Sequence, residues 1–343
     1  MGKRPDIRFD VASVLNRGRR DYQEDAIATD FPLGAEFGYA VLSDGMGGHA
    51  AGDVASKIVV TEVFSELKFQ SSDIRSLAEN VCDVLKSAAV SANACMAAHT
   101  TNNPDTAGMG ATLVAPVIVR DQLFWISIGD SPLYLFRRGE LRQLNEDHSL
   151  GPHIDYMVRS GMMSEDVGRN HPDRNALTSV LIGEVIERID CPDKPLRLRD
   201  GDILVVASDG LQFLSNRDIR RVLDESSDMD STAIADRLLT ELRELDDPEQ
   251  DNVCFSVIKI SLPPVGEDST NIFATDFENR PRKKRQVTTR PIKPRPVAPE
   301  EAAAFPAAVN EAQEAPRHEA EPANERGNLF LRRRWLATDG GGA

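Results

Sequence analysis

Several short apolar runs in this chain are bordered by an aspartate, usually with a glycine beside it. The runs and their acids are residues 39–43 before Asp44, 123–128 before Gly129 and Asp130, 203–208 before Asp209, and 253–258 after Asp251 and Asn252. Short runs rich in β-branched side chains, with glycine nearby, favour strands over helices. We therefore expect a strand-rich core with aspartates at the ends of buried strands.

Helical periodicity appears in three longer stretches, residues 54–67, 74–98 and 232–245. Residues 113–136 hold two or three strands with tight turns, which is typical of an antiparallel meander. Strands and helices do not alternate in the regular order of a parallel sheet. This pattern predicts an α+β fold, with antiparallel sheets covered by helices.

The composition changes near Pro263 and Pro264. Residues 264–343 hold 13 Lys/Arg and 12 Asp/Glu, which leaves residues 1–263 with 27 basic and 43 acidic side chains, a net charge of −16. Proline and alanine dominate the second part, and apolar periodicity ends there. We expect a folded domain at 1–263 and a disordered, charged tail at 264–343. An alternative is that the basic block at 280–295 docks onto an acidic partner or the acidic domain.

Charge and cysteine usage argue against several classes of protein. The formal net charge of −15 argues against a nucleic-acid binder with a basic surface. The four cysteines are scattered without a Cys-x-x-Cys pair, which argues against a disulfide framework and a zinc site. We see no secretory signal and no run of 18 apolar residues, so we expect a cytoplasmic protein without a membrane span.

Aspartates from separate strand ends can converge on one cleft, and Asp25 is a further candidate upstream. Converging carboxylates repel each other unless cations neutralise them. Ligand sets made only of oxygen select hard ions such as Mg²⁺ or Mn²⁺. Two such ions, about 3.5–4 Å apart, can activate a water and bind a phosphoryl group. The carbonyl oxygen of Gly45, which has no side chain to block it, is a further candidate ligand.

The order of the motifs along the chain is specific enough to indicate a family. The chain resembles the metal-dependent protein phosphatase (PPM) family, the type 2C serine/threonine phosphatases, in its bacterial form, from about residue 9 to residue 260. The matching motifs are Arg20-Asp21-Tyr22-Gln23-Glu24-Asp25, Asp44-Gly45-Met46-Gly47-Gly48-His49, Gly110-Ala111-Thr112-Leu113, Gly129-Asp130-Ser131, Asp147-His148-Ser149-Leu150, His171-Pro172-Asp173-Arg174-Asn175, Ser208-Asp209-Gly210-Leu211 and Asp251-Asn252-Val253.

The resemblance implies a fold and a set of site residues. The fold is a four-layer α-β-β-α sandwich of two antiparallel sheets flanked by helices, with a flap at about residues 151–190 that contributes to substrate choice. The resemblance implies that Asp44 bridges two ions, that Asp209 and Asp251 complete one of them, and that the Gly45 carbonyl completes the other. It implies that Asp25 and Glu24 act mainly through metal-bound waters and that Asp130 helps to bind a weaker third ion. It also implies that Arg20 cradles the substrate phosphate.

The implied function is hydrolysis of phosphoserine and phosphothreonine in proteins by a metal-activated water. The implied partners are phosphorylated protein substrates, such as a serine/threonine kinase or its targets. The sequence leaves two alternative functions open. One is a catalytically weak phosphoprotein-binding scaffold, and the other is a two-metal phosphoesterase that acts on small phosphates.

Some positions depart from the family pattern. Met46, Pro132 and Asn145 stand where many members carry other residues, whereas the proposed metal-binding acids are intact. Cys191 and Arg197 have the Cys-x₅-Arg spacing of cysteine-dependent phosphatases, but the loop between them holds two prolines and no glycine to cradle a phosphate. His148 lies between Asp147 and Ser149 without the Gly-x-Ser-x-Gly motif of a serine hydrolase.

Overall fold

The computed structural model describes residues 7–47 and 50–262. The strands are β1 (Arg8–Asn16), β2 (Asp25–Asp30), β3 (Phe37–Met46), β4 (Gly110–Ala111), β5 (Leu113–Val119), β6 (Gln122–Ile128), β7 (Leu133–Arg137), β8 (Glu140–Gln143), β9 (Leu196–Arg197), β10 (Ile203–Ala207) and β11 (Val253–Ser261). The helices are α1 (Ala50–Gln70), α2 (Ile74–Asn102), α3 (Gly151–Arg159), α4 (Glu165–Arg169), α5 (Asn216–Glu225) and α6 (Ser231–Leu245), with short 3₁₀ turns η1 (Pro104–Thr106) and η2 (Asp209–Phe213). The predicted tail at 264–343 lies outside the described residues, as do Gly48 and His49 of the motif after β3.

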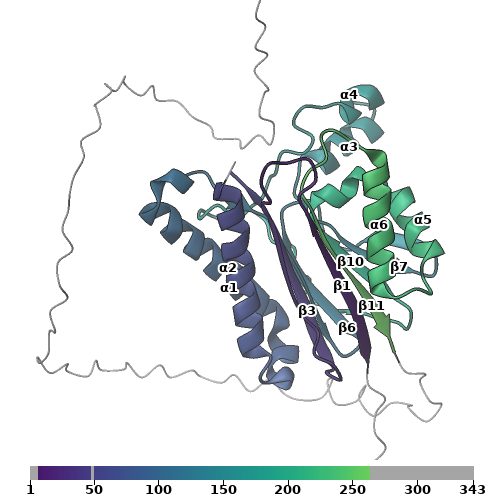
Figure 1. Cartoon of the computed structure of the whole chain (residues 1–343). Coiled ribbons are helices and arrows are strands. Elements are labelled where there is room, and N and C mark those ends of the chain that lie inside the picture. The colour runs from purple at the N-terminus through teal and green to yellow at the C-terminus, as the bar shows by residue number, and fades with distance from the viewer. Residues whose placement is uncertain (1–6, 48–49, 263–343) are drawn as a thin grey trace, which may run out of the picture. The chain divides into compact units, whose positions relative to one another are not determined.

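The strands form two sheets at the centre of this fold (Figure 1). The first sheet has the order β1-β11-β10-β7-β8, and the second has the order β2-β3-β5-β6-β9. The strand β4 pairs with β3 beside the second sheet. Neighbouring strands in both sheets run antiparallel, as the sequence predicts.

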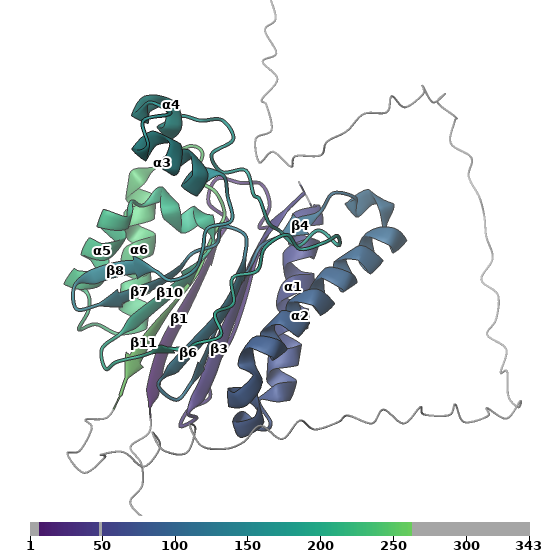
Figure 2. The same cartoon turned by 180° about the vertical axis from the view of Figure 1, so that it is seen from behind.

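Alternating side chains on the strands build three apolar layers. On β3, Tyr39 and Val41 pack under α1 and α2, whereas Ala40 and Leu42 face the core between the two sheets. The outer face of the first sheet packs in the same way under α5 and α6. Figure 2 shows the helices on the outer faces of the two sheets. The predicted four-layer α-β-β-α sandwich is therefore confirmed.

The helix predictions were incomplete. The three predicted stretches lie within α1, α2 and α6, but α3, α4 and α5 lie outside them. Ser215 caps α5 by accepting a hydrogen bond from the Asp218 amide. Only three of its side chains are buried, Ile219, Val222 and Leu223, so its apolar face is too short to dominate the surrounding charges.

Helix α2 has the length and composition of a membrane-spanning helix, although no run of 18 apolar residues is present. Seven of its side chains lie in the core that it shares with α1 and the second sheet. They are Leu77, Val81, Leu85, Ala88, Ala89, Ala92 and Met96. These seven side chains of the helix are therefore core residues of the domain, whereas Val90 is exposed.

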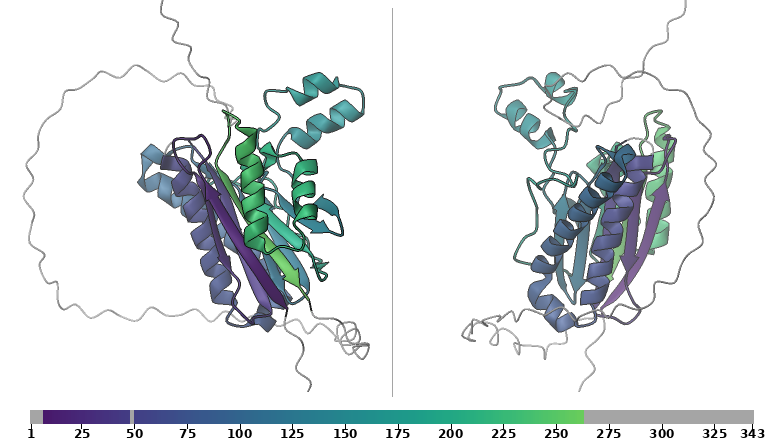
Figure 3. Two further views of the ribbon diagram at one scale, coloured as in Figure 1. Left: turned by 45° about the vertical axis from the view of Figure 1, so that its right-hand side comes forward. Right: turned by 90° about the vertical axis from the view of Figure 1, so that its left-hand side faces the viewer.

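The predicted flap region contains α3 and α4, which stand apart from both helical layers (Figure 3). Ser149 and Leu177 form a bridge that closes the base of this excursion. Farther along, Leu181 pairs with Ala111 and Asp190 pairs with Ser127. The chain thus leaves the sheets near residue 149 and returns along the edge of the second sheet.

Candidate active site

The aspartates singled out from the sequence lie at the ends of strands in both sheets. Asp25 begins β2 and lies directly opposite Asp44, near the end of β3. Asp209 follows β10 and Asp251 precedes β11. Because β10 and β11 are also antiparallel, the end of one meets the start of the other. Each sheet therefore carries a pair of aspartates at one of its ends.

Hydrogen bonds join these two ends. The hydroxyl of Ser208 donates to Asp25 Oδ2 at 2.8 Å, although the two residues belong to different sheets. The amide of Glu24 donates to Asn252 Oδ1 at 2.7 Å, again from one sheet to the other. These contacts place four aspartates at the same end of the two sheets, and we call them the aspartate rim: Asp25, Asp44, Asp209 and Asp251.

Two acids of the rim are deeply buried. Asp25 is 3% exposed and Asp44 is 6% exposed. Their charge reaches the neighbouring thiol of Cys254. Burial raises the pKa of Cys254 well above its ordinary value, and the negative charges of Asp25 and Asp44 raise it further. This end of the sheets therefore concentrates negative charge in a poorly solvated place.

Arg20 reaches the rim from the loop between β1 and β2. Its guanidinium donates to Asp251 Oδ2 at 2.8 Å. The loop is held by Asn252, whose Nδ2 donates to the carbonyls of Arg17 at 2.8 Å and Tyr22 at 2.9 Å. The buried amide of Asn252 thus fixes the backbone on both sides of Arg20.

Gly45 lies where the end of β3 packs closely against the first turn of α1. A Cβ at this position would lie 1.9 Å from the Gly52 carbonyl oxygen and 2.7 Å from that of Glu24. The Gly45 amide donates to the same Glu24 carbonyl at 3.0 Å. Since the atoms in the way are backbone atoms, only glycine fits here.

Asp130 belongs to the corner after β6 and is linked to the rim through Thr112. The hydroxyl of Thr112 accepts a hydrogen bond from the Asp44 amide at 3.0 Å and lies 2.7 Å from the Ser131 hydroxyl. The Thr112 amide donates to the Asp44 carbonyl at 2.9 Å. Thr112 therefore ties the Asp130 corner to the strand end that carries Asp44.

The residues at the rim offer a donor set made of oxygen, which suits Mg²⁺ or Mn²⁺ rather than zinc or copper. Within residues 7–47 and 50–262, no three His, Cys, Asp or Glu side chains form a group compact enough to hold a metal ion. Carboxylates repel one another, and cations between them offset that repulsion. The chemistry of the donors and the close packing at Gly45 fit a site for hard cations.

Three residues that organise the site were not assigned roles from the sequence. Thr112, Ser208 and Asn252 stand within the matched motifs, but each acts through partners that are distant along the chain. Ser208 and Asn252 stand beside acids of their motifs, whereas Thr112 has no acid beside it in the sequence.

The Cys-x₅-Arg match does not form a phosphate-binding loop. Burial, together with contact with Cys82, raises the pKa of Cys191 from 9.0 to about 12. The guanidinium of Arg197 donates to Asp121 Oδ2 at 2.7 Å. The cysteine is therefore a neutral thiol near neutral pH, and the arginine is engaged with a carboxylate.

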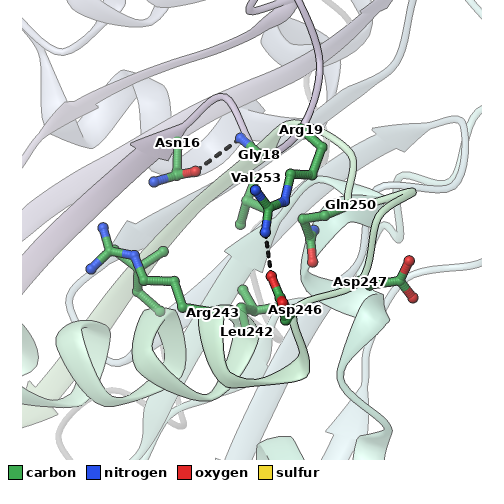
Figure 4. Close-up of a pocket in the computed structure, with 10 residues that line it drawn as sticks. Asn16, Gly18, Arg19, Leu242, Arg243, Asp246, Asp247, Gln250 and Val253 are labelled. Carbon is green, nitrogen blue, oxygen red and sulfur yellow. Dashed lines mark hydrogen bonds and ion pairs between the residues drawn. The ribbon is translucent and has the colours of Figure 1, made fainter.

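A pocket of about 260 Å³ lies between the β1–β2 loop and the end of α6 (Figure 4). Arg19 and Asp246 form an ion pair across it, and Gln250 lines it. Its lining includes the neighbours of Arg20 and Asp251 but neither of these two residues. The pocket is therefore adjacent to the rim and separate from the proposed ligands.

Comparison with known proteins gives one family. The sequence profile described as Protein phosphatase 2C matches residues 16–244. The chain is 34% identical over 171 residues to the serine/threonine phosphatase stp of Listeria welshimeri, covering 50% of this chain and 65% of that protein. It is 29% identical over 231 residues to stp of Listeria monocytogenes serotype 4b, covering 67% of this chain and 87% of that protein.

A similar solved structure is the catalytic domain of the serine/threonine protein phosphatase PstP in complex with two manganese ions. The identity is 28% and the TM-score is 0.56. The match covers 74% of this chain and 99% of that domain. Its extent agrees with the part of the chain that forms the two sheets and their helices.

Proposed function

The chain belongs to the protein phosphatase 2C family of metal-dependent serine/threonine phosphatases, and we propose that the aspartate rim holds the metal ions of its active site. The substrates are phosphorylated proteins. One observation carries the proposal: Asp25 and Asp44 are buried opposite each other, and hydrogen bonds bring them to the same end as Asp209 and Asp251.

Each proposed ligand has a distinct role. Asp44 would help to hold two ions, Asp209 and Asp251 would complete the ligands of one, the Gly45 carbonyl would complete those of the other, Asp25 and Glu24 would act mainly through coordinated waters, and Asp130 would contribute to a weaker third. When bound, Mg²⁺ or Mn²⁺ ions supply an activated water and neutralise charge on the phosphoryl group. The similar PstP domain in complex with two manganese ions supports the first two of these ions.

Arg20 binds the substrate phosphate. Its guanidinium can donate two parallel hydrogen bonds to phosphate oxygens. It donates to Asp251 at 2.8 Å, so a phosphate group at the rim competes with this carboxylate for the guanidinium. Because Asn252 holds the backbone around Arg20, the side chain needs little rearrangement to reach a phosphate beside Asp251.

The proposed setting is the cytoplasm of a bacterial cell, with a serine/threonine kinase or its targets as the dephosphorylated partner. The four cysteines are free thiols, which suits a reducing compartment. The names of the bacterial relatives support the link to phosphorylation on serine and threonine.

The test is release of phosphate from a phosphothreonine peptide by the full chain with Mn²⁺, with and without a chelator. We expect release with Mn²⁺, none with the chelator, and none from Asp44→Asn. The matched control is Asp121→Asn, because Asp121 lies in the β5–β6 turn at the other end of the same sheet. Release from nucleotides but not from peptides would instead favour a small-phosphate esterase, and no release with any divalent ion would favour a binding scaffold.

A further inference from the structure

His148 holds both backbone groups of Gly129. The Gly129 amide donates to His148 Nδ1 at 3.2 Å, and the His148 amide donates to the Gly129 carbonyl at 3.0 Å. His148 is fully buried, with 0% of the residue exposed. This double contact fixes the corner from which Asp130 projects.

These hydrogen bonds define the protonation state of His148. Since Nδ1 accepts a hydrogen bond, the proton of the neutral ring is on Nε2. Burial lowers the pKa of His148 and the charge of Arg188 lowers it further, against the opposing charges of Glu146, Asp190 and Asp147. The ring is therefore neutral near pH 7, and Nε2 lies 3.9 Å from Glu146 Oε2.

On its other side, Gly129 packs against Thr112. The backbone of Gly129 has φ +106°, and a Cβ there would lie 2.6 Å from the Thr112 methyl carbon. Thr112 in turn bonds the Asp44 amide and the Ser131 hydroxyl. Gly129 is thus clamped between His148 and the residue that contacts Asp44.

His148 also ties this corner to the base of the flap. Its carbonyl accepts hydrogen bonds from the Thr178 amide at 2.7 Å and from the Thr178 hydroxyl at 2.9 Å. The next residue, Ser149, forms the bridge with Leu177 from which α3 and α4 extend. One residue therefore contacts both the Asp130 corner and the two ends of the excursion.

We propose that His148 is a positioning residue of the phosphatase reaction, whose Nδ1 holds the Gly129–Asp130 corner in place beside Asp44 and fixes the base of the flap to that corner. The proposal rests on the proposed metal-binding role of Asp130. Residues that orient metal ligands typically change metal affinity or activity by roughly 10–100-fold when replaced.

The first test replaces His148 with two amide side chains whose polar atoms lie at different positions of the imidazole ring. In His148→Asn the side-chain oxygen occupies the position of Nδ1, whereas in His148→Gln the polar atoms lie at the position of Nε2. We expect His148→Asn to retain most of the wild-type kcat. We expect His148→Gln to lower kcat or raise the Mn²⁺ requirement by roughly tenfold, with little change in KM for the phosphopeptide. Wild-type kinetics in a folded His148→Gln variant, or equal loss in both variants, would overturn the proposal.

Two further measurements do not depend on activity. Amide hydrogen exchange should show Gly129 protected in the wild type and in His148→Asn, and exposed in His148→Gln. Nitrogen NMR on the wild-type chain at pH 7 should show the proton of His148 on Nε2, and a proton on Nδ1 would contradict the proposal. If the wild type releases no phosphate, the proposed function fails, while these two readouts still decide whether Nδ1 holds Gly129.

Discussion

Asp25 and Asp44 lie directly opposite each other on neighbouring antiparallel strands, and both side chains are almost fully buried. Like charges directly opposite each other in a sheet destabilise it. Their burial makes the repulsion stronger than it would be at a solvated surface. The fold therefore places a locally unfavourable pair at the proposed active site, where bound cations would offset this cost.

The first prediction concerns stability with and without metal. In chelator, Asp44→Asn should stabilise the fold by up to about 1 kcal/mol, because one of two opposed charges is removed. With Mn²⁺ at 100 times its dissociation constant, the wild type should gain about 2.7 kcal/mol, whereas Asp44→Asn should gain much less. Thermal unfolding with and without Mn²⁺ measures both effects. Equal stabilisation of the two proteins by Mn²⁺ would refute the assignment of Asp44.

Gly45→Ala should damage the site through packing. The added methyl group meets the backbone of Gly52 and Glu24, so strand and helix must separate. We expect a loss of about 2–3 kcal/mol in the free energy of unfolding, together with loss of phosphate release. Gly108→Ala is the control, since its Cβ would meet nothing within 4 Å, and it should cost only about 1 kcal/mol for its positive φ. A Gly45→Ala variant as stable and active as this control would be inconsistent with the packing described.

Asn252→Ala should loosen the loop that carries Arg20. The change removes all three hydrogen bonds that the buried Asn252 side chain makes to the Glu24 amide and to the Arg17 and Tyr22 carbonyls. We expect a loss of about 2–3 kcal/mol in stability and a higher KM for the phosphopeptide. Asn102→Ala, in which an exposed amide loses one bond to Ala98, is the matched control. An unchanged KM in Asn252→Ala would show that the amide does not position Arg20.

The strands, their antiparallel pairing and the acids at their ends could be predicted because each follows from local pattern, whereas the arrangement in two sheets was implied by the resemblance to the phosphatase family. A short apolar run predicts a strand, and an aspartate directly after it is expected at the edge of the sheet. The role of Thr112 could not be predicted, since its partners Asp44 and Ser131 are determined by strand pairing. His148 was weighed as part of a hydrolase site, but its ring contacts a backbone amide instead.

Two departures from the family pattern turn out to be neighbours in space. Asn145 Nδ2 donates to the Ser131 carbonyl at 3.0 Å, and its Oδ1 accepts from the Leu133 amide at 2.7 Å. These two residues flank Pro132, which has no amide hydrogen of its own. Asn145 therefore holds the backbone on both sides of the proline, a relationship that the sequence spacing does not reveal.

Cys191 should be dispensable and slow to react. Because its pKa is raised to about 12, it remains a thiol at pH 8, with roughly one molecule in 10⁴ as the reactive thiolate. A raised pKa means that the folded state holds this proton more tightly. The resulting stability is complete below pH 9.0 and is lost as the pH rises toward about 12. Cys191→Ser should keep wild-type phosphate release, and rapid inactivation by alkylation of Cys191 at pH 8 would contradict this assignment.

The most direct test of the metal site is the number of Mn²⁺ ions bound per chain, measured by isothermal titration calorimetry on the full-length protein. The wild type and Asp121→Asn should each bind two ions with high affinity. Asp44→Asn should bind neither tightly, because the bridging carboxylate is gone. Two tightly bound ions in Asp44→Asn, or none in the wild type, would contradict the proposal that the aspartate rim is the metal centre.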